Sequence, residues 1–257
     1  MGANSAVFLM YHEIELADRP LCRPDAGYTR YAIPRDEFRL QIAAIRELAF
    51  SGVSVTEALE FSRSAVAITV DDGCETDLLV VAPLLAEFGF RATFYASPGL
   101  LGKKGFLSAA QLRELSDLGF EVGSHSMTHR FLTDLSDLDL RRELEQSKQV
   151  LEQMVEKPVV HFSCPGGRSD ARVAQAAARA GYRTLADSIP HANSSSTSPF
   201  SLGRVAIRRG LGVDRFRRFC RGRSLWKLRA GSSIRDAAKR ILGNANYERI
   251  RESMLPG

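Results

Sequence analysis

The chain has 257 residues, of which 44% are hydrophobic and 25% are charged, values typical of a globular protein and not of a disordered or fibrous one. No stretch approaches the roughly 20 consecutive apolar residues of a membrane-spanning helix, and the N-terminal residues lack the basic leader and long apolar core of a signal peptide. We therefore expect a cytoplasmic protein with one large domain or two small ones.

The net charge of +5 is unevenly distributed along the chain. From Ser201 onward there are 15 basic and 4 acidic residues, whereas the preceding part has 20 basic and 26 acidic residues. The acidic body and the basic end could therefore meet different partners.

The four cysteines, Cys22, Cys74, Cys164 and Cys220, lie far apart and form no CxxC pair. This spacing argues against a structural zinc knuckle and against a disulfide framework. We expect reduced thiols. Cys74 and Cys164 adjoin two of the motifs described below and could ligate a metal ion, but we expect them to be small packing residues.

The first half of the chain alternates predicted strands and helices. Residues 6–11 predict a buried strand, and residues 34–50 predict a helix that has Pro34 in its first turn. Three segments then repeat one pattern, an apolar helix end, a glycine, an aromatic residue and a strand: LAEFGFRATFY, LSDLGFEVGSH and AARAGYRTLAD. Their glycines, Gly89, Gly119 and Gly181, suit the left-handed position that ends a helix. Serial βα units of this kind predict a parallel sheet or barrel.

The second half continues with a predicted helix at 136–157 and a predicted strand at 159–163. Residues 191–199, rich in Ser and Asn, predict a surface loop, and residues 202–207 predict another strand. From Asp214 onward the sequence is helical in pattern and strongly basic. We weigh three interpretations of this end: a helical layer packed on the body, docking to a membrane surface, and nucleic-acid binding without a recognition motif.

The stretch AVAITVDDGCETD, residues 65–77, predicts a buried strand that ends in Asp71 and Asp72. Ligands and catalytic groups gather where the strands of an α/β protein end. Two adjacent like charges need compensation by a cation or a shared proton. Consecutive side chains point in different directions, so one aspartate could bind a metal ion while its neighbour acts as a general base.

A second motif, FEVGSHSMTH, follows another predicted strand and contains His125 and His129. On a helical turn, two histidines four residues apart share one face and can bind one metal ion. Two imidazoles and one carboxylate form a facial set that leaves positions open for water and substrate.

A third stretch, FSCPGGR, ends the strand predicted at 159–163. A proline followed by two glycines exposes backbone N–H groups and lets a ligand approach closely. Such a loop can bind the oxyanion that develops during acyl chemistry, although on its own it is a generic tight turn.

The motifs TVDDG, HSMTH and FSCPGG, in this order, resemble those of the polysaccharide deacetylases with a NodB-homology domain, carbohydrate esterase family 4. The segments LMYHEI and FRLQIAAIRELAFSGVSV are similar to the branch found with exopolysaccharide biosynthesis genes. The resemblance covers most of the chain and implies a distorted (β/α) barrel of about seven parallel strands. We assign residues 1–212 to this catalytic domain and residues 213–257 to a basic helical extension packed on the barrel.

The resemblance also implies roles for individual residues. Asp71 becomes the catalytic base, while Asp72, His125 and His129 become the metal ligands. The loop of Pro165, Gly166, Gly167 and Arg168 becomes the substrate-binding segment, with the Gly166 N–H as oxyanion donor. The implied cofactor is a divalent metal ion, zinc in the first place, with nickel, cobalt, iron or manganese as alternatives.

Two departures from the family pattern concern the site. The family often has an arginine at the start of its third motif and a tyrosine after the proline. In this chain Ser163 and Gly166 stand near these two positions instead. The family's general acid is a histidine in a late strand, which reads LGRVAIRRG here. His12 and His191 are the candidates to replace it. His161, inside a predicted strand, has the pattern of a structural residue.

We therefore expect a metal-dependent hydrolase that removes N-acetyl groups from an amino sugar or a polysaccharide precursor, which could be lipid-linked. The alternatives are hydrolysis of another C–N amide or an acetyl ester, and a degenerate carbohydrate-binding relative. The expected partner is a carbohydrate, with peripheral contact to the inner membrane surface through the basic end and without nucleic acid.

Overall fold

The structure, a computed structural model, describes residues 5–60 and 65–229. The strands are β1 Ser5–Tyr11, β2 Gly52–Val53, β3 Ala65–Asp72, β4 Thr93–Ala96, β5 Glu121–Ser124, β6 His161–Ser163, β7 Thr184–Ala186, β8 Ala192–Ser194 and β9 Arg204–Ala206. The α-helices are α1 Ala26–Thr29, α2 Arg35–Glu47, α3 Val55–Glu60, α4 Ala82–Glu87, α5 Ala109–Asp117, α6 Asp137–Val155, α7 Ala171–Arg179 and α8 Val213–Cys220. Three other short turns are η1 Asp77–Val81, η2 Leu132–Asp134 and η3 Pro165–Gly167.

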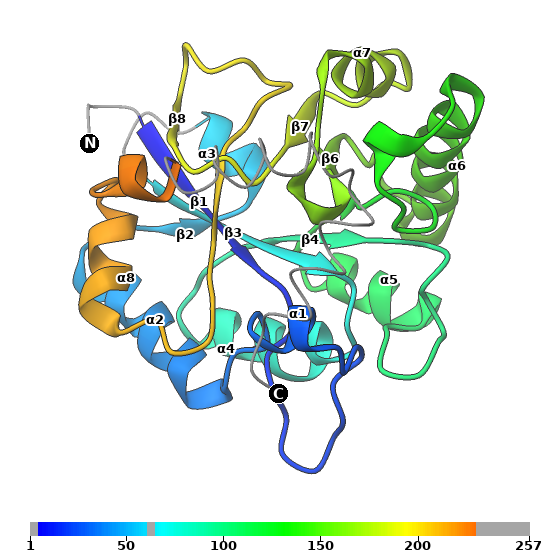
Figure 1. Cartoon of the computed structure of the whole chain (residues 1–257). Helices are drawn as coiled ribbons and strands as arrows, with labels where there is room; N and C mark the ends of the chain where they lie inside the picture. The colour runs from blue at the N-terminus through cyan, green and yellow to red at the C-terminus, as the bar shows by residue number, and fades with distance from the viewer. Residues whose placement is uncertain (1–4, 61–64, 230–257) are drawn as a thin grey trace.

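The strands form one curled sheet in the order β7-β6-β5-β4-β3-β1-β8, with β2 beside β3 and β9 beside β1. All neighbouring strands are parallel except β8, which runs antiparallel to β1. The helices surround the outside of this sheet (Figure 1). The predicted distorted (β/α) barrel is confirmed by this architecture.

The sheet curls until its two ends approach each other. At one end, β9 pairs with β1, so that Phe8 lies opposite Arg204. At the other end, Ala186 of β7 forms a bridge with Leu202, two residues before β9 begins. This closure brings the carboxyl ends of strands far apart in the sequence to one rim.

The central strand β3 is buried along its whole length, as expected of a parallel strand covered on both faces. Helices α2, α5 and α6 cover the sheet with apolar faces, and α6 buries Leu140, Leu144 and Leu151. The three glycines predicted to end helices, Gly89, Gly119 and Gly181, have φ of 68°, 86° and 83°. The repeated helix, glycine and strand pattern is thereby confirmed.

The predicted loop at 191–199 contains a short strand that was not predicted from the sequence. Residues 192–194 form β8, which pairs antiparallel with the start of β1. The Asn193 side chain donates to the Gly203 carbonyl and accepts from the Gly203 N–H, both at 2.9 Å. A segment rich in Ser and Asn can therefore occupy the sheet because side-chain hydrogen bonds help to fix it.

The basic end begins with α8, which packs against α2 through buried Phe216 and Phe219. Arg217 forms an ion pair with Glu47 of α2 at 2.5 Å. Residues 230–257 of the predicted extension lie outside the described residues, so the domain boundary at 212 stays a prediction. Among the described helices, none combines the length and apolarity that a membrane crossing requires.

Candidate active site

Asp71 and Asp72 are the last two residues of β3, where the strand reaches the rim of the barrel. Both residues are about 1% exposed. Asp72 has φ of +83°, a left-handed conformation that is uncommon for residues other than glycine. Backbone strain of this kind persists only where surrounding contacts hold it, and it concentrates at functional sites.

The left-handed turn places the Asp72 carboxylate against both predicted metal-binding histidines. Its Oδ1 lies 3.0 Å from His129 Nε2 and 3.4 Å from His125 Nε2. Burial alone would raise the pKa of the Asp72 carboxyl, but His129 and His125 bring it well below its usual value. The structure therefore joins Asp72, His125 and His129 in one cluster, as the sequence predicted.

The two histidines do not lie on a helical turn, so that part of the prediction was wrong. Residues 125–129 form an irregular loop after β5, with left-handed φ of 63° at Ser126 and 61° at His129. The loop is fixed from both sides. Ser97 Oγ donates to the His125 carbonyl at 2.6 Å, and the Thr128 N–H donates to Glu143 of α6 at 2.8 Å.

The ring orientation of His125 suits a metal ligand. His125 Nδ1 lies 2.8 Å from the Ser163 carbonyl, which can only accept a hydrogen bond, so Nδ1 carries the proton. In the neutral ring, Nε2, which faces Asp72, is then left with its lone pair. Burial alone would lower the pKa of His125, but Asp71 and Asp72 raise it above the ordinary histidine value.

The other aspartate, Asp71, forms a buried, bidentate ion pair with Arg204 of β9. The two guanidinium nitrogens lie 2.7 and 2.8 Å from the two carboxylate oxygens. Ser163 Oγ also donates to Asp71, at 3.2 Å. Burial alone would raise the pKa of Asp71, but the Arg204 guanidinium and the His125 ring hold it below its usual value. Asp71 is thus kept as a carboxylate.

Arg204 is fully buried and uses all five of its N–H donors. Besides Asp71, it donates to Thr69 Oγ1 at 3.1 Å, to Ser163 Oγ at 2.6 Å and to the Asp187 carbonyl at 3.0 Å. The role of Arg204 was not predicted, because the resemblance to the family implied a catalytic histidine in this strand and drew no attention to the arginine. One signal was available, a charged residue among the apolar residues of a predicted strand. A buried charge needs an ionic partner.

The third motif, Pro165–Arg168, lies at the end of β6 on the same rim. Gly166 and Gly167 have left-handed φ of 63° and 65°. A Cβ at Gly166 would lie 2.8 Å from Phe131, and one at Gly167 would lie 2.0 Å from Ser188 Oγ, so both positions require glycine. Arg168 stacks on Phe131 with its guanidinium carbon 3.8 Å from the ring centroid. The substrate-binding role of this loop stays a prediction.

The two candidate acids occupy different places. His12 directly follows β1 and lies in the field of the aspartates, since Asp71 and Asp72 both act to raise its pKa, although burial lowers the pKa overall. Its ring packs 4.8 Å from that of Tyr31, and its buried Nδ1 has no hydrogen-bond partner within the described residues.

His191 is not brought into this cluster. It precedes β8, whose residues pair with the start of β1, whereas the cluster lies where β1 ends. Its Nδ1 is 3.1 Å from the Ile189 carbonyl, and a Cβ at Gly203 would lie 2.1 Å from the ring. The structure therefore does not place His191 with the aspartates and the other histidines. His161 has the structural role expected of it, with Nδ1 2.8 Å from Thr184 and Nε2 2.8 Å from Thr56.

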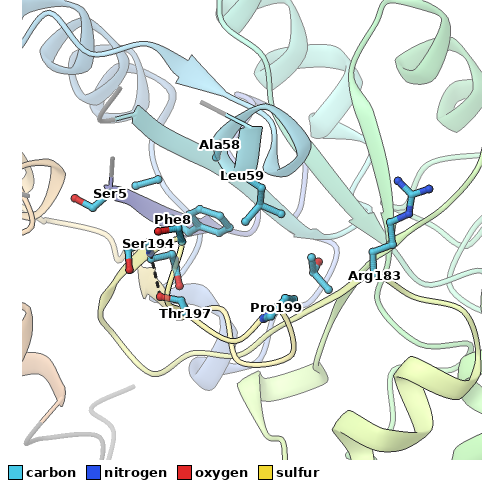
Figure 2. A pocket seen from close by; sticks show the side chains of 12 residues that line it. Ser5, Phe8, Ala58, Leu59, Arg183, Ser194, Thr197 and Pro199 are labelled. Atoms are coloured by element: carbon cyan, nitrogen blue, oxygen red, sulfur yellow. Dashed lines mark hydrogen bonds between the residues drawn. The ribbon is translucent and has the colours of Figure 1, made fainter. Parts of the chain in front are cut away.

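A cavity of about 510 Å³ opens at the opposite end of the barrel (Figure 2). It is lined by the start of β1, including Ser5 and Phe8, by Leu59, and by Ser194 and Thr197 around β8. The aspartate and histidine cluster lies at the other end of β1 and does not line it. This cavity is therefore separate from the aspartate and histidine cluster.

The residues around Asp72 fit a divalent cation. One ligand atom from each of Asp72, His125 and His129 lies within 4.8 Å of the other two. Asp72 Oδ1 is buried, and the two imidazole Nε2 atoms are the polar side-chain groups that face it within the described part of the chain. Two imidazole nitrogens and one carboxylate oxygen are donors typical of zinc and of other transition metals.

Comparisons with known proteins agree with this fold. Residues 58–185 match the family model of polysaccharide deacetylases. YxkH, a candidate polysaccharide deacetylase of Bacillus subtilis, is 24% identical over 215 residues, which are 81% of this chain and 73% of that protein. A peptidoglycan-N-acetylglucosamine deacetylase of Bacillus cereus is 31% identical over 132 residues, 51% of this chain and 60% of that one.

Solved structures share the fold at lower sequence identity. The deacetylase PplD of Streptococcus pyogenes has a TM-score of 0.73 at 22% identity, covering 84% of this chain and 98% of its own. IcaB of Ammonifex degensii has a TM-score of 0.74 at 20% identity, covering 84% and 97%. The chain belongs to the polysaccharide deacetylase family and is a deacetylase enzyme.

Proposed function

We propose that the protein is a metal-dependent hydrolase that removes N-acetyl groups from an N-acetylated amino sugar, free or within a polysaccharide precursor. The observation that carries this proposal is the asymmetry of the two adjacent aspartates. Asp72 faces two histidines, whereas Asp71 is held by an arginine. One carboxylate is thus placed to bind a cation and its neighbour to accept a proton.

The metal site is formed by Asp72, His125 and His129. A divalent cation bound there would supply Lewis-acid polarisation of the acetamide carbonyl and of water. Zinc is our first choice because imidazole and carboxylate ligands suit it, although nickel, cobalt, iron and manganese accept the same donors.

Asp71 is the general base in this proposal. It removes a proton from the water that attacks the carbonyl carbon, and the Arg204 pair keeps it ionised and oriented for this step. The Gly166 N–H, on the loop after β6, is the proposed donor to the developing oxyanion. His12 then gives a proton to the leaving nitrogen as the C–N bond breaks, which yields acetate and a free amine.

The substrate class is supported by the relatives. The Bacillus cereus relative is named for deacetylation of N-acetylglucosamine in peptidoglycan. We extend an amino-sugar substrate to this chain and suggest an exopolysaccharide precursor, which in the cytoplasm would be short or lipid-linked.

The basic end of the chain supports contact with an anionic membrane surface or a phosphate-bearing carrier. Among the described residues, its exposed side chains include Arg215, Arg218, Arg221, Arg223 and Trp226. Trp226 is 69% exposed, and aromatic and basic residues together favour a membrane interface. Sedimentation with anionic vesicles at low and high salt tests this point, and no binding at either salt concentration would contradict it.

The principal test is acetate release by the purified protein with added zinc. N-acetylated chito-oligosaccharides and lipid-linked N-acetylated sugars are the substrates to compare. The Asp71→Asn variant should retain its metal, as metal analysis would show, and should lose turnover. If the metal-loaded protein releases acetate from none of these substrates, the proposed function is wrong.

A further inference from the structure

A second cluster of reactive side chains lies beside the aspartates but does not belong to the metal site. Cys74 follows Asp72 by two residues and is fully buried, and Cys22 lies in the segment between β1 and α1. Their sulfur atoms are 2.8 Å apart, although 52 positions separate them in the sequence. The Tyr28 hydroxyl contacts both sulfurs, at 3.1 and 3.2 Å.

The backbone on the Cys22 side is held in place from two directions. The Glu13 carboxylate accepts the Cys22 N–H with its two oxygens, at 3.1 and 3.0 Å. Gly105 packs so closely that a Cβ there would lie 2.8 Å from the Cys22 Cα. These contacts fix the position of the Cys22 backbone, and with it the approach of its sulfur to Cys74.

The Cys74 side is fixed by its own backbone contacts. Cys74 forms an antiparallel bridge with Phe106, next to the Gly105 that contacts Cys22. An ion pair between Arg19 and Glu75 also connects the segment that contains Cys22 to the turn that contains Cys74. The two thiols are thus juxtaposed by contacts from both sides.

From this arrangement we propose that Cys22 and Cys74 are a redox-modification site, a dithiol that closes to a disulfide when it reacts with a small disulfide such as oxidised glutathione. The pair needs little movement, because the sulfurs are less than 1 Å farther apart than the roughly 2.05 Å of a disulfide bond. Cys22 is partly exposed and can meet the oxidant, whereas Cys74 is shielded.

The reaction is balanced as two thiol–disulfide exchanges. The Cys22 sulfur attacks one sulfur of oxidised glutathione, forms a mixed disulfide and releases one glutathione. The Cys74 sulfur then attacks the Cys22 sulfur and releases the second glutathione. The two cysteines lose two electrons and two protons, and the two glutathione thiols gain them.

A metal ion is the competing occupant of this cluster, because Glu13, Cys22 and Cys74 have ligand atoms within 4.8 Å of one another. Two thiolates on a tetrahedral zinc ion, each about 2.3 Å from the metal, are about 3.7 Å apart. Binding would have to separate the sulfurs by about 1 Å from their observed distance, against the contacts that fix both segments. Disulfide formation moves them in the opposite direction and by less.

The test uses the full-length protein, reduced and treated with a chelator, then incubated in buffers with increasing ratios of oxidised to reduced glutathione. After alkylation, intact mass and peptide mapping should show two fewer reactive thiols and one linked Cys22–Cys74 peptide. The Cys220→Ser variant, which changes a buried cysteine elsewhere, should still lose two thiols. Cys74→Ser should instead accumulate a glutathione adduct on Cys22, since the second exchange is blocked.

A second measurement follows the folded protein. A bond that closes a loop of this length should raise the melting temperature of the oxidised protein by several degrees, reversibly, and Cys22→Ser should abolish the difference. Four alkylatable thiols under all conditions, or linked peptides that join other cysteines, would overturn the proposal. One equivalent of zinc that requires both Cys22 and Cys74 would also overturn it, in favour of a metal site. Both readouts are independent of deacetylase activity.

Discussion

Arg204 and Asp71 meet in the barrel interior as a bidentate ion pair, although they come from strands 133 residues apart in the sequence. Asp71 is the penultimate residue of β3 and Arg204 begins β9, and β1 lies between these two strands in the sheet. The ion pair determines the protonation state of Asp71, the proposed base, because the Arg204 guanidinium lowers the pKa of this buried carboxyl and keeps it ionised.

Replacing Arg204 by methionine should destabilise the protein by about 3–5 kcal/mol, because it leaves the Asp71 carboxylate buried without its cation. Urea unfolding at pH 7 measures this effect. The effect should shrink at acidic pH, since Asp71 has a lowered pKa in the folded state. Its contribution is complete above the unfolded-state pKa of about 4 and is lost as the pH falls through the folded-state pKa. Arg218→Met, at an exposed position, is the control and should change stability by less than about 0.5 kcal/mol.

An arginine at position 163 should partly replace Arg204 as the cation beside Asp71. The Ser163 hydroxyl contacts both Arg204 and Asp71, so residue 163 is adjacent to both partners of the ion pair. We expect Arg204→Ser to lower kcat for acetate release by at least about tenfold, because Asp71 loses its orienting partner. Adding Ser163→Arg to that variant should restore part of the loss. Equal rates for the single and double variants would show that a cation on β6 cannot replace one on β9.

His12→Asn should lower kcat by about 10²-fold or more, the usual contribution of a positioned general acid. An acid must be protonated to act, so kcat/KM of the native enzyme should fall as the pH rises through the His12 pKa. Burial lowers that pKa, which places the descending limb below the ordinary histidine range. The variant should lack this limb and should still bind one equivalent of metal. An unchanged pH profile would exclude His12 as the acid.

Glu121 at the start of β5 should stabilise the amino-terminal end of the barrel. Its carboxylate accepts hydrogen bonds from Thr56 and Thr93 and lies 3.3 Å from His161. Burial alone would raise the pKa of Glu121, but His161 and the two threonines lower it. Glu121→Gln should therefore cost about 1–3 kcal/mol at neutral pH.

The pH dependence of that cost provides the check. A carboxylate with a lowered folded-state pKa stabilises the protein above its unfolded-state pKa, about 4.3, and ceases to do so as the pH falls through the folded-state pKa. Unfolding free energies of the native protein and of Glu121→Gln should therefore converge at low pH. Acetate release by the folded variant should remain, because Glu121 lies at the opposite end of its strand from the His125 loop.

The sequence predicted features that depend on local pattern. Glycines at helix ends and repeated βα units indicated the barrel, and motif order indicated that Asp72, His125 and His129 would share a rim. The left-handed backbone at Asp72 and His129 was not predicted, because neither residue type requires it. The Arg204 pair was missed for another reason: a contact across 133 residues depends on how the sheet closes, which no local pattern specifies.

The closure of the sheet by β1 and β9 has a consequence for where the catalytic unit begins and ends. The family model matches residues 58–185, which contain both aspartates and both histidines of the proposed metal site. His12 precedes that segment and Arg204 follows it, so the proposed acid and the cation beside the base are supplied by the flanking parts of the chain. A fragment of residues 58–185 would keep every motif of the family but lack the two side chains that complete its proton chemistry. If His12 and Arg204 have the roles proposed above, we expect the smallest active unit of this protein to be longer than the segment that the family model matches.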